Sequence, residues 1–338
     1  MQRNLVKICI LPKEGIAPPY QKLMMGGLRE SGFDVIYGSP KRFFCILITY
    51  FKNKPDWIHF DWPYFFYSIN LPTPFKWVAF YWFNFQLFII KELTRCKIAY
   101  TLHNLERHAF YNDEIDHKTQ AIVFKYSTFV RVFNKRTIDK VSAKWNGIDL
   151  DKFYIQPEGS YVNYYPNEIN PLIAREYFGY GPNDFVILCF GSIRPYKGII
   201  ELIDGFIAFR GNNWKLIIAG YPFDKQYTND VIEKCKGNPD IKIVVGHQSE
   251  DKLQYFFNAC NVVACPFKQI ENSGSVILAM GFKKPVIAPN KGVVKYRLKE
   301  QSQLLYNESI NEVLISIKSM NLRELETIGE KNFEAVES

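Results

Sequence analysis

Two basic residues share one short loop in the second half of the chain. The run 191–198, GSIRPYKG, follows an apolar segment with strand character and precedes a segment with helical spacing. Gly191 ends the strand, and Arg194 and Lys197 project from the turn beside the helix start. A guanidinium and an ammonium in such a place can hold a diphosphate and stabilise the negative charge that grows on it as it leaves. Taken alone, a loop with two basic residues is more often a solvated turn.

A second loop, within the run 270–280, IENSGSVILAM, also lies between a strand and a helix. Its Ser273, Gly274 and Ser275 would place free backbone N–H groups and hydroxyls at a helix N-terminus, which is a ready site for an anion. Glu271 stands just before them and can accept hydrogen bonds from sugar hydroxyls. The alternative is an ordinary helix cap, since serine is common at that position.

Alternating strands and helices must position these loops. In the first half we expect a helix over 21–31 and strands over 5–11, 33–37, 57–60 and 97–102. In the second half we expect helices over 199–209, 251–259 and 274–281, and strands over 185–190, 215–219, 242–245, 262–265 and 285–288. Such alternation predicts an α/β fold with two Rossmann-like parallel sheets.

The chain of 338 residues is long enough for two domains of ordinary size. We place a first domain at 1–165, a second at 166–320 and a C-terminal helix at 321–338, which we expect to pack on the first domain. A polar stretch at 160–171 joins the domains, and we expect both to face a cleft that holds a ligand at the carboxyl ends of the strands. Because the sequence has no G-x-G-x-x-G run, a dinucleotide-dependent dehydrogenase lacks its main signature.

The net charge of +8 lies wholly in the first half. Residues 1–165 hold 22 Lys and Arg against 14 Asp and Glu, whereas residues 166–338 hold 20 of each kind. A basic half predicts an anionic partner, such as a membrane surface, a lipid diphosphate or nucleic acid. The basic residues are dispersed and no nucleic-acid-binding motif occurs, so we expect no nucleic acid partner. A basic surface that serves only solubility is the plain alternative.

Aromatic residues concentrate in the same half, where 57–88 holds 15 of the 55 Phe, Tyr and Trp residues. The stretch 77–90 has no charged residue, but its 14 residues fall short of the roughly 20 that span a bilayer. We predict one helix there, and two roles stay open. It is either a buried core helix or a helix whose surplus aromatic side chains touch lipid at the membrane interface.

The seven cysteines are scattered without a C-x-x-C pair, and the five histidines show no metal-ligand spacing. We therefore expect reduced core thiols and no metal. The first apolar run, at 5–11, ends at Pro12 and has strand character rather than the form of a secretory signal. These features predict a cytoplasmic protein. The basic, aromatic first half adds peripheral association at the inner face of an anionic membrane as one of its two open roles.

The order of these motifs resembles the nucleotide-sugar domain of GT-B glycosyltransferases. The chain is most similar to the large retaining family that carries an E-x7-E motif, and within it to a bacterial subgroup with R-P-Y-K-G and S-G-S motifs. The resemblance covers most of the chain and is densest over 187–292. It implies two Rossmann-like domains facing a cleft. It also implies a hexosyltransferase that moves a sugar from a nucleotide-diphosphate sugar to a glycan or lipid-diphosphate acceptor in surface polysaccharide synthesis.

The resemblance also implies which residues act on each substrate. The donor-binding set is Gly191, Arg194, Lys197, His247, Glu271, Asn272, Ser273, Gly274 and Ser275. The runs 58–63, IHFDWP, and 100–104, YTLHN, resemble acceptor-domain motifs, in which a histidine at the position of His103 lies close to the transferred sugar. The residues expected to take part in catalysis are His103, Arg194, Lys197 and Glu271. The acceptor-side candidates are Asp61, Asn104, Glu106 and His108.

One position departs from the family pattern. Glu271 matches the first Glu of E-x7-E, but Ala279 stands where the second Glu would bind the nucleotide ribose. The resemblance implies that the leaving group is stabilised by protein charges and a helix start, without a metal or another cofactor. If the reaction retains the anomeric configuration, no protein base is required. If it inverts it, the candidate bases are Asp61, His103, Glu106 and His108.

Other functions share this fold. One alternative is a non-catalytic GT-B-like protein that binds a sugar or a nucleotide, and another is a phosphorylase or an epimerase. Hydrolysis of a nucleotide sugar in the absence of acceptor would distinguish an enzyme from a binding protein.

Overall fold

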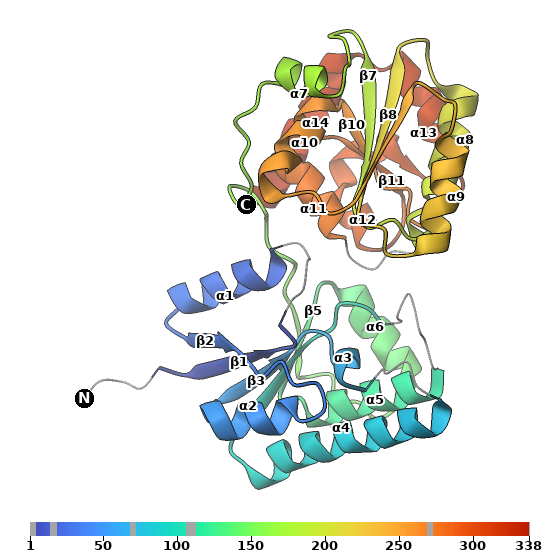
Figure 1. Cartoon of the computed structure of the whole chain (residues 1–338). Helices are drawn as coiled ribbons and strands as arrows, with labels where there is room; N and C mark the ends of the chain where they lie inside the picture. The colour runs from blue at the N-terminus through green and yellow to red at the C-terminus, as the bar shows by residue number, and fades with distance from the viewer. Residues whose placement is uncertain (1–4, 14–18, 68–71, 106–112, 269–272, 338) are drawn as a thin grey trace. The chain divides into compact units, whose positions relative to one another are not determined.

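The chain forms two compact units, Met1–Gly159 and Ser160–Ser338. The structure is a computed structural model, and it describes residues 5–13, 19–67, 72–105, 113–268 and 273–337 (Figure 1). Each unit has its own parallel sheet and its own hydrophobic core.

Within the described residues, the first unit is built on a six-stranded sheet with the order β2-β1-β3-β4-β5-β6, and its strands run parallel. The strands are β1 (Lys7–Leu11), β2 (Asp34–Tyr37), β3 (Trp57–Phe60), β4 (Lys97–Thr101), β5 (Phe129–Val132) and β6 (Phe153–Ile155). The helices are α1 (Tyr20–Glu30), α2 (Cys45–Asn53), α3 (Tyr64–Tyr67), α4 (Thr73–Leu93), α5 (Asp113–Tyr126) and α6 (Lys135–Lys144).

Helices cover the two faces of this sheet unequally. Helix α1 packs on one face over a small core, and α2, α4 and α5 pack on the other over a larger core that contains Phe60 and Phe83 (Figure 1). The small core consists of Ile8, Ile10, Met25 and Val35. Side chains alternate along a strand, so the face on the α1 side also receives His59, Thr101 and Arg131, which are buried polar residues.

The aromatic stretch of the first half forms one helix, α4, as the sequence predicts. Pro74 stands in the first turn of α4, where the N–H that proline lacks would have no partner within the helix. The helix ends before Thr94, whose backbone is extended. The buried side of α4 carries Phe80, Phe83, Leu87 and Ile90 into the larger core. The opposite side is also apolar, yet it is exposed. Of the helices described, none has both the length and the apolar character needed to cross a membrane.

The described part of the second unit has a six-stranded parallel sheet with the order β12-β11-β10-β7-β8-β9. Its strands are β7 (Phe185–Phe190), β8 (Trp214–Gly220), β9 (Ile241–Val245), β10 (Val262–Ala264), β11 (Val286–Pro289) and β12 (Leu305–Tyr306). Its α-helices are α7 (Pro171–Tyr177), α8 (Ile199–Phe209), α9 (Lys225–Cys235), α10 (Leu253–Ala259), α11 (Gly274–Gly281), α12 (Gly292–Arg297), α13 (Asn311–Ser316) and α14 (Leu322–Glu337). Short 3-10 turns are η1 (Pro195–Lys197), η2 (Glu250–Lys252), η3 (Lys299–Leu304) and η4 (Ile317–Ser319).

The C-terminal helix α14 packs within the second unit. Leu325 and Ile328 join the core that α8, α9 and α13 form on one face of the sheet. Asn332 Nδ2 donates to Gln301 Oε1 at 2.7 Å and to the Lys284 carbonyl at 3.1 Å. The helix that we expected to pack on the first domain therefore buries its apolar side in the second unit.

All seven cysteines are buried and none forms a disulfide with another. Burial raises the pKa of each thiol, for example to about 11 for Cys9 and about 12 for Cys45.

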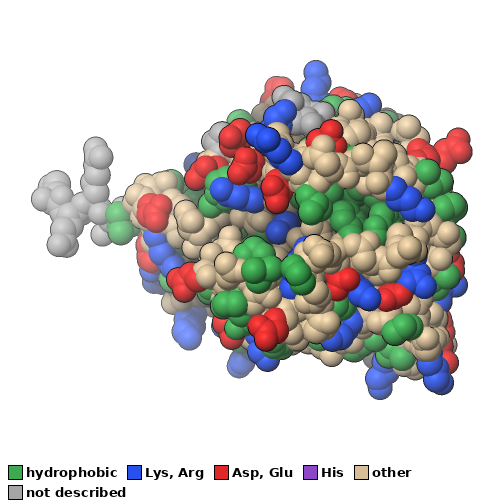
Figure 2. Space-filling view, turned by 90° about the horizontal axis from the view of Figure 1, so that it is seen from above, with side chains coloured by type: hydrophobic (Ala, Val, Ile, Leu, Met, Phe, Trp, Pro, Cys, Tyr) green, Lys and Arg blue, Asp and Glu red, His purple; other side chains and the backbone are tan. Residues whose placement is uncertain are grey.

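On the face of the molecule shown in Figure 2, positive and negative side chains are interspersed, with apolar side chains between them.

The predicted fold class is confirmed, because both units are α/β with parallel Rossmann-like sheets. The strands at 57–60 and 185–190 and the helices at 199–209 and 274–281 have the predicted bounds. The sequence analysis assigned no element to the segments that form α2, α5, α6, α9, β5 and β6.

Candidate active site

In the second unit, the loop after β7 lies against the loop after β8. Gly191 has a φ of +130°, and a Cβ built on Gly220 would lie 1.5 Å from the Gly191 carbonyl oxygen. The backbones can therefore approach only because residue 220 is glycine. The Ile193 N–H donates to the Tyr221 carbonyl at 2.8 Å and continues the contact. These loops lie at the carboxyl edge of the sheet, where α/β proteins bind ligands.

Lys197 places a buried ammonium at this edge. Its Nζ donates to Ser275 Oγ at 3.3 Å and lies 4.4 Å from the centre of the Phe267 ring. Gly198 has a φ of +67°, and a Cβ there would lie 2.0 Å from the Pro266 carbonyl oxygen, so glycine lets this loop meet the loop after β10. No carboxylate among the described residues forms an ion pair with Lys197. A buried cation without a counter-charge favours binding of an anion.

The start of α11 supplies the other half of this anion site. The Ser273 side chain accepts a hydrogen bond from the Val276 N–H at 3.4 Å, so Ser273 is the helix cap. The first N–H groups of a helix have no partner within the helix and carry its positive dipole end. Ser275, whose hydroxyl meets Lys197, lies in this first turn. The ammonium and the helix start together suit a phosphate group.

The remaining donor-side candidates are spread over neighbouring loops. The Arg194 guanidinium carbon lies 3.3 Å from the centre of the Phe223 ring, which belongs to the loop after β8. His247 follows β9 and is exposed. The structure thus brings Lys197 and Ser275 into direct contact, and Gly191 lies beside them, since a Cβ built on it would be 3.0 Å from Ser275 Oγ and 3.5 Å from Lys197 Nζ. Two of the predicted residues, Glu271 and Asn272, lie outside the described residues.

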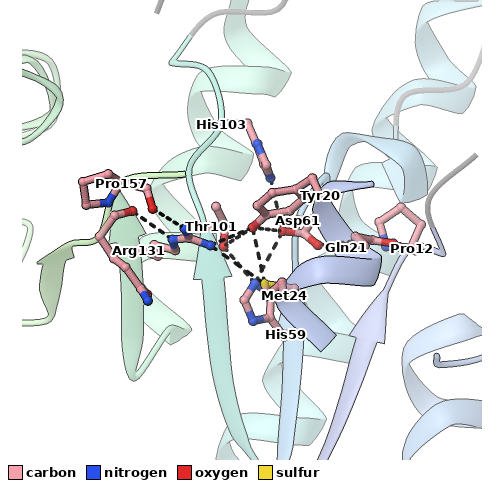
Figure 3. A network of polar contacts seen from close by, with 11 residues as sticks. Pro12, Tyr20, Gln21, Met24, His59, Asp61, Thr101, His103, Arg131 and Pro157 are labelled. Atoms are coloured by element: carbon pink, nitrogen blue, oxygen red, sulfur yellow. Dashed lines mark hydrogen bonds and ion pairs between the residues drawn. The ribbon is translucent and has the colours of Figure 1, made fainter. Parts of the chain in front are cut away.

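In the first unit, a buried carboxylate stands directly after β3 (Figure 3). Asp61 Oδ1 lies 3.1 Å from both the Tyr20 hydroxyl and His103 Nε2, and Oδ2 accepts a hydrogen bond from Gln21 Nε2 at 2.7 Å. His59 Nε2 lies 3.5 Å from Oδ1. Four polar side chains from three segments of the chain therefore converge on Asp61.

Asp61 is held as an anion. Burial alone would raise its pKa, but the charge of His59 and the hydrogen bonds from His103 and His59 outweigh burial, so the pKa lies well below its ordinary value. An ionised carboxylate only accepts hydrogen bonds. The His103 nitrogen that faces Asp61 therefore carries a proton.

Arg131 ties this network to the end of the first unit. Its Nη1 donates to the Tyr20 hydroxyl at 3.1 Å, while Nε and Nη2 donate to the carbonyls of Gln156 and Pro157 at 3.0 and 2.7 Å. Burial and the charge of Asp61 raise the pKa of Tyr20 well above its usual value, so its hydroxyl remains a donor to the carboxylate.

His103 lies next to the surface. Its side chain is 13% exposed, against 10% for His59 and 0% for Asp61. The ring stacks on Trp62 at 4.8 Å between centres and meets the Tyr20 ring edge-on at 4.9 Å. Nε2 is bonded to Asp61, and within the described part of the chain no residue hydrogen-bonds to Nδ1. Nδ1 is therefore free to accept a proton from a substrate.

The structure joins two of the predicted acceptor-side residues, Asp61 and His103. Asn104 follows them and is half-buried, while Glu106 and His108 lie outside the described residues. Thr101 also belongs to the network, because its hydroxyl lies 2.8 Å from His59 Nε2. Five members were not selected from the sequence: Tyr20, Gln21, His59, Thr101 and Arg131. His59 and Thr101 had a local signal, because each stands two residues before a selected residue, Asp61 or His103. No group of three His, Cys, Asp or Glu side chains suited to a metal ion occurs among the residues that the structure describes.

Comparison with protein families gives one match in the second unit: residues 175–321 fit the family described as Glycosyl transferases group 1. A GDP-mannose:glycolipid 4-beta-D-mannosyltransferase of Xanthomonas campestris pv. campestris is 26% identical over 241 residues, which cover 70% of this chain and 62% of that protein. A lipopolysaccharide 1,2-N-acetylglucosaminetransferase of Salmonella typhimurium is 29% identical over 208 residues, covering 58% of this chain and 49% of that protein. The chain thus spans less than two thirds of the length of these relatives.

Solved structures match nearly the whole chain. Sucrose-phosphate synthase from Thermosynechococcus elongatus has a TM-score of 0.74 at 14% identity. The match covers 99% of this chain and 94% of the synthase chain. Anabaena HepE in complex with UDP and glucose has a TM-score of 0.73 at 16% identity, with coverage of 98% and 94%. At these identities the likeness shows the fold. The chain therefore has the GT-B fold of these proteins, and its residues 175–321 match the group 1 glycosyltransferases.

Proposed function

We propose that the chain is a glycosyltransferase that moves a sugar from a nucleotide-diphosphate sugar to a lipid-linked glycan acceptor in surface polysaccharide synthesis. The observation that carries the proposal is the buried Lys197 ammonium at the start of α11. A nucleoside diphosphate is the leaving group that such a site fits, and the family match covers the same unit.

The donor-side chemistry is electrostatic. Lys197, Arg194 and the N–H groups of α11 stabilise the charge that develops on the diphosphate when the bond to the sugar breaks. We propose that these groups are in place before the reaction, so that little reorganisation is required. We propose that the reaction needs no metal and no cofactor beyond the donor, with Glu271 and His247 as further donor contacts.

The acceptor-side chemistry centres on His103. We assign it the role of proton acceptor for the case in which the displacement inverts the anomeric centre; a retaining reaction needs no protein base. The acceptor oxygen bonds to the anomeric carbon, the bond from that carbon to the diphosphate oxygen breaks with its electron pair, and the hydroxyl proton passes to Nδ1. Asp61 is a positioning residue, since it holds the opposite ring nitrogen and stabilises the imidazolium that forms.

The substrate classes follow the relatives. The Xanthomonas protein is named for GDP-mannose and a glycolipid, the Salmonella protein for lipopolysaccharide, and HepE was solved with UDP and glucose. A nucleoside diphosphate is named for the Xanthomonas protein and for HepE, and a lipid-bearing acceptor for the Xanthomonas and Salmonella proteins. We extend both classes to this chain. The free thiols of the chain are in keeping with a reaction on the cytoplasmic side of a bacterial membrane.

The test is steady-state turnover of nucleotide sugars by a Lys197→Met variant, which keeps the apolar stem that packs near Phe267. We expect kcat/KM to fall by roughly 100-fold, about 2.7 kcal/mol of transition-state stabilisation. The matched control is Lys236→Ala, which removes an exposed lysine paired with Glu233 on the surface and should leave turnover unchanged. Near-normal turnover by a folded Lys197→Met enzyme would rule out the leaving-group role. Nucleotide binding without turnover in the wild type would instead identify a binding protein.

A further inference from the structure

Helix α4 carries large apolar side chains on an exposed side as well as on its buried side. Phe80, Phe83 and Leu87 face the core. Val78, Tyr81, Phe85 and Phe88 recur at steps of three and four residues, so they form one stripe, and they are 65%, 64%, 51% and 42% exposed. A surface helix normally carries polar side chains on that side. This stripe is therefore an exposed apolar surface that the fold itself does not use.

The segment that enters α2 widens this stripe. The Trp82 indole N–H and Gln86 Nε2 both donate to the Phe43 carbonyl, and the Phe44 ring lies 5.1 Å from that of Trp82. Phe43 and Phe44 are themselves 49% and 52% exposed. The aromatic face consists of these two residues and the four of the α4 stripe.

The two segments that carry the aromatic face are strongly basic in sequence. The segments 41–54 and 73–95, which contain α2 and α4, hold seven Lys and Arg and a single acidic residue, Glu92, a net charge of +6. This is most of the net charge of +8 in the first unit. The Arg42 guanidinium lies over the Phe65 ring at 5.1 Å, so cationic groups and exposed rings intermix here. The long basic side chains can extend past an apolar surface to reach anionic groups beside it.

We propose that the aromatic face seats the first unit on a bilayer that contains anionic phospholipid. Aromatic and aliphatic side chains on a helix that lies in the plane of the membrane enter the headgroup boundary, while neighbouring Lys and Arg bind the anionic headgroups. A second copy of this chain fits the same face poorly, because it would bring a charge of +6 against a charge of +6. Charge complementarity therefore selects lipid.

The proposal rests on the proposed function in one respect: membrane binding would bring the enzyme to a lipid-linked acceptor. Its test measures binding to vesicles and uses no substrate. A failure here would leave the donor site untouched, and an inactive enzyme could still bind vesicles.

The experiment compares two double variants in vesicle flotation, with vesicles of phosphatidylcholine and phosphatidylglycerol at low salt. Tyr81→Gln with Phe85→Gln removes two rings from the face, and Leu172→Gln with Ile173→Gln removes two comparably exposed apolar residues from α7. We expect the first variant to lower the partition coefficient at least tenfold and the control to match the wild type. High salt should weaken binding of the wild type without abolishing it, because burial of the rings is not screened.

Three results would overturn the proposal. One is a wild type that stays with the soluble fraction at low salt. Another is equal binding by the two double variants, which would place the contact elsewhere. The third is a wild type that is dimeric by light scattering, becomes monomeric in Tyr81→Gln with Phe85→Gln, and does not float, which would make the face an interface between copies. Thermal unfolding of each variant confirms that it is folded.

Discussion

Asp61 is the residue on which the first unit's site depends. It accepts hydrogen bonds from Tyr20, Gln21 and His103 in a fully buried position. Its side chain comes from the residue directly after a strand, and its partners come from the start of α1 and from the loop after β4. Removing its charge should therefore loosen three segments of the chain at once.

We predict that Asp61→Asn lowers the free energy of unfolding by about 3 kcal/mol at neutral pH. The buried groups that hydrogen-bond to the carboxylate would then lose their charged partner. The folded pKa of Asp61 is depressed, so its stabilisation is fully present above the unfolded value of about 3.9 and is lost as pH falls toward the folded value. Urea unfolding from pH 8 to pH 3 measures this. The gap between wild type and variant should stay constant down to about pH 5 and shrink below pH 4. A gap that instead closes between pH 8 and pH 6 would assign the effect to histidine titration.

At the scale of single residues, the site residues that follow a strand could be predicted from the sequence. Those that reach the site from other segments of the chain could not. Asp61, His103 and Lys197 follow strands, so their edge of the sheet could be predicted. Arg131 sits inside the short strand β5, which was not recognised, and Tyr20 and Gln21 open a helix. Their meeting with Asp61 depends on how α1 packs over the sheet, which no local pattern encodes.

Among the elements, α4 shows that an exposed apolar stripe and a buried one contribute differently to stability. We predict that Phe83→Ala, in the core, lowers the free energy of unfolding by about 3–5 kcal/mol. Phe85→Ala, which is two residues away on the outer side, should change it by about 0.5 kcal/mol or less. Paired urea unfolding curves with equal slopes provide the comparison. If Phe85→Ala proved as destabilising as Phe83→Ala, the outer stripe would be part of the fold and not a free surface.

Three of the four elements that have the predicted bounds lie next to a glycine or end in one; the exception is β3, which is flanked by two aspartates. Helix α8 begins after Gly198 and α11 ends at Gly281, and both have the predicted bounds. Helix α2 was missed because its sequence, CILITYFKN, is rich in β-branched and aromatic residues that favour strands. It is helical because Cys45, Ile46 and Thr49 then share one buried side against the larger core. Tertiary packing decided this element over local propensity.

For the whole molecule, two separate cores predict two separable unfolding transitions. Five of the six tryptophans lie in the first unit, and Trp214 lies in the second. We predict that UDP or GDP at 100 times its dissociation constant stabilises the second unit by about 2.7 kcal/mol and leaves the first unit unchanged.

Optical probes separate these transitions. In a Trp214→Phe variant, fluorescence reports the first unit alone, while far-ultraviolet circular dichroism reports both. The nucleotide should raise the unfolding midpoint of the second unit, which circular dichroism detects and fluorescence does not. The fluorescence transition of the first unit should stay where it is. A nucleotide that moves the fluorescence transition by the same amount would mean that it binds the first unit, or that the units unfold together.

Because all seven thiols are buried, the native chain should react very little with thiol-specific labels. With thiol pKa values raised to between about 11 and about 12, almost no thiolate is available at neutral pH to attack a maleimide. A single Val78→Cys substitution on the outer side of α4 would then be the one fast-reacting position. A solvatochromic dye attached there would change colour as it left water for lipid, so the wild-type cysteines need not be removed to follow this face by fluorescence.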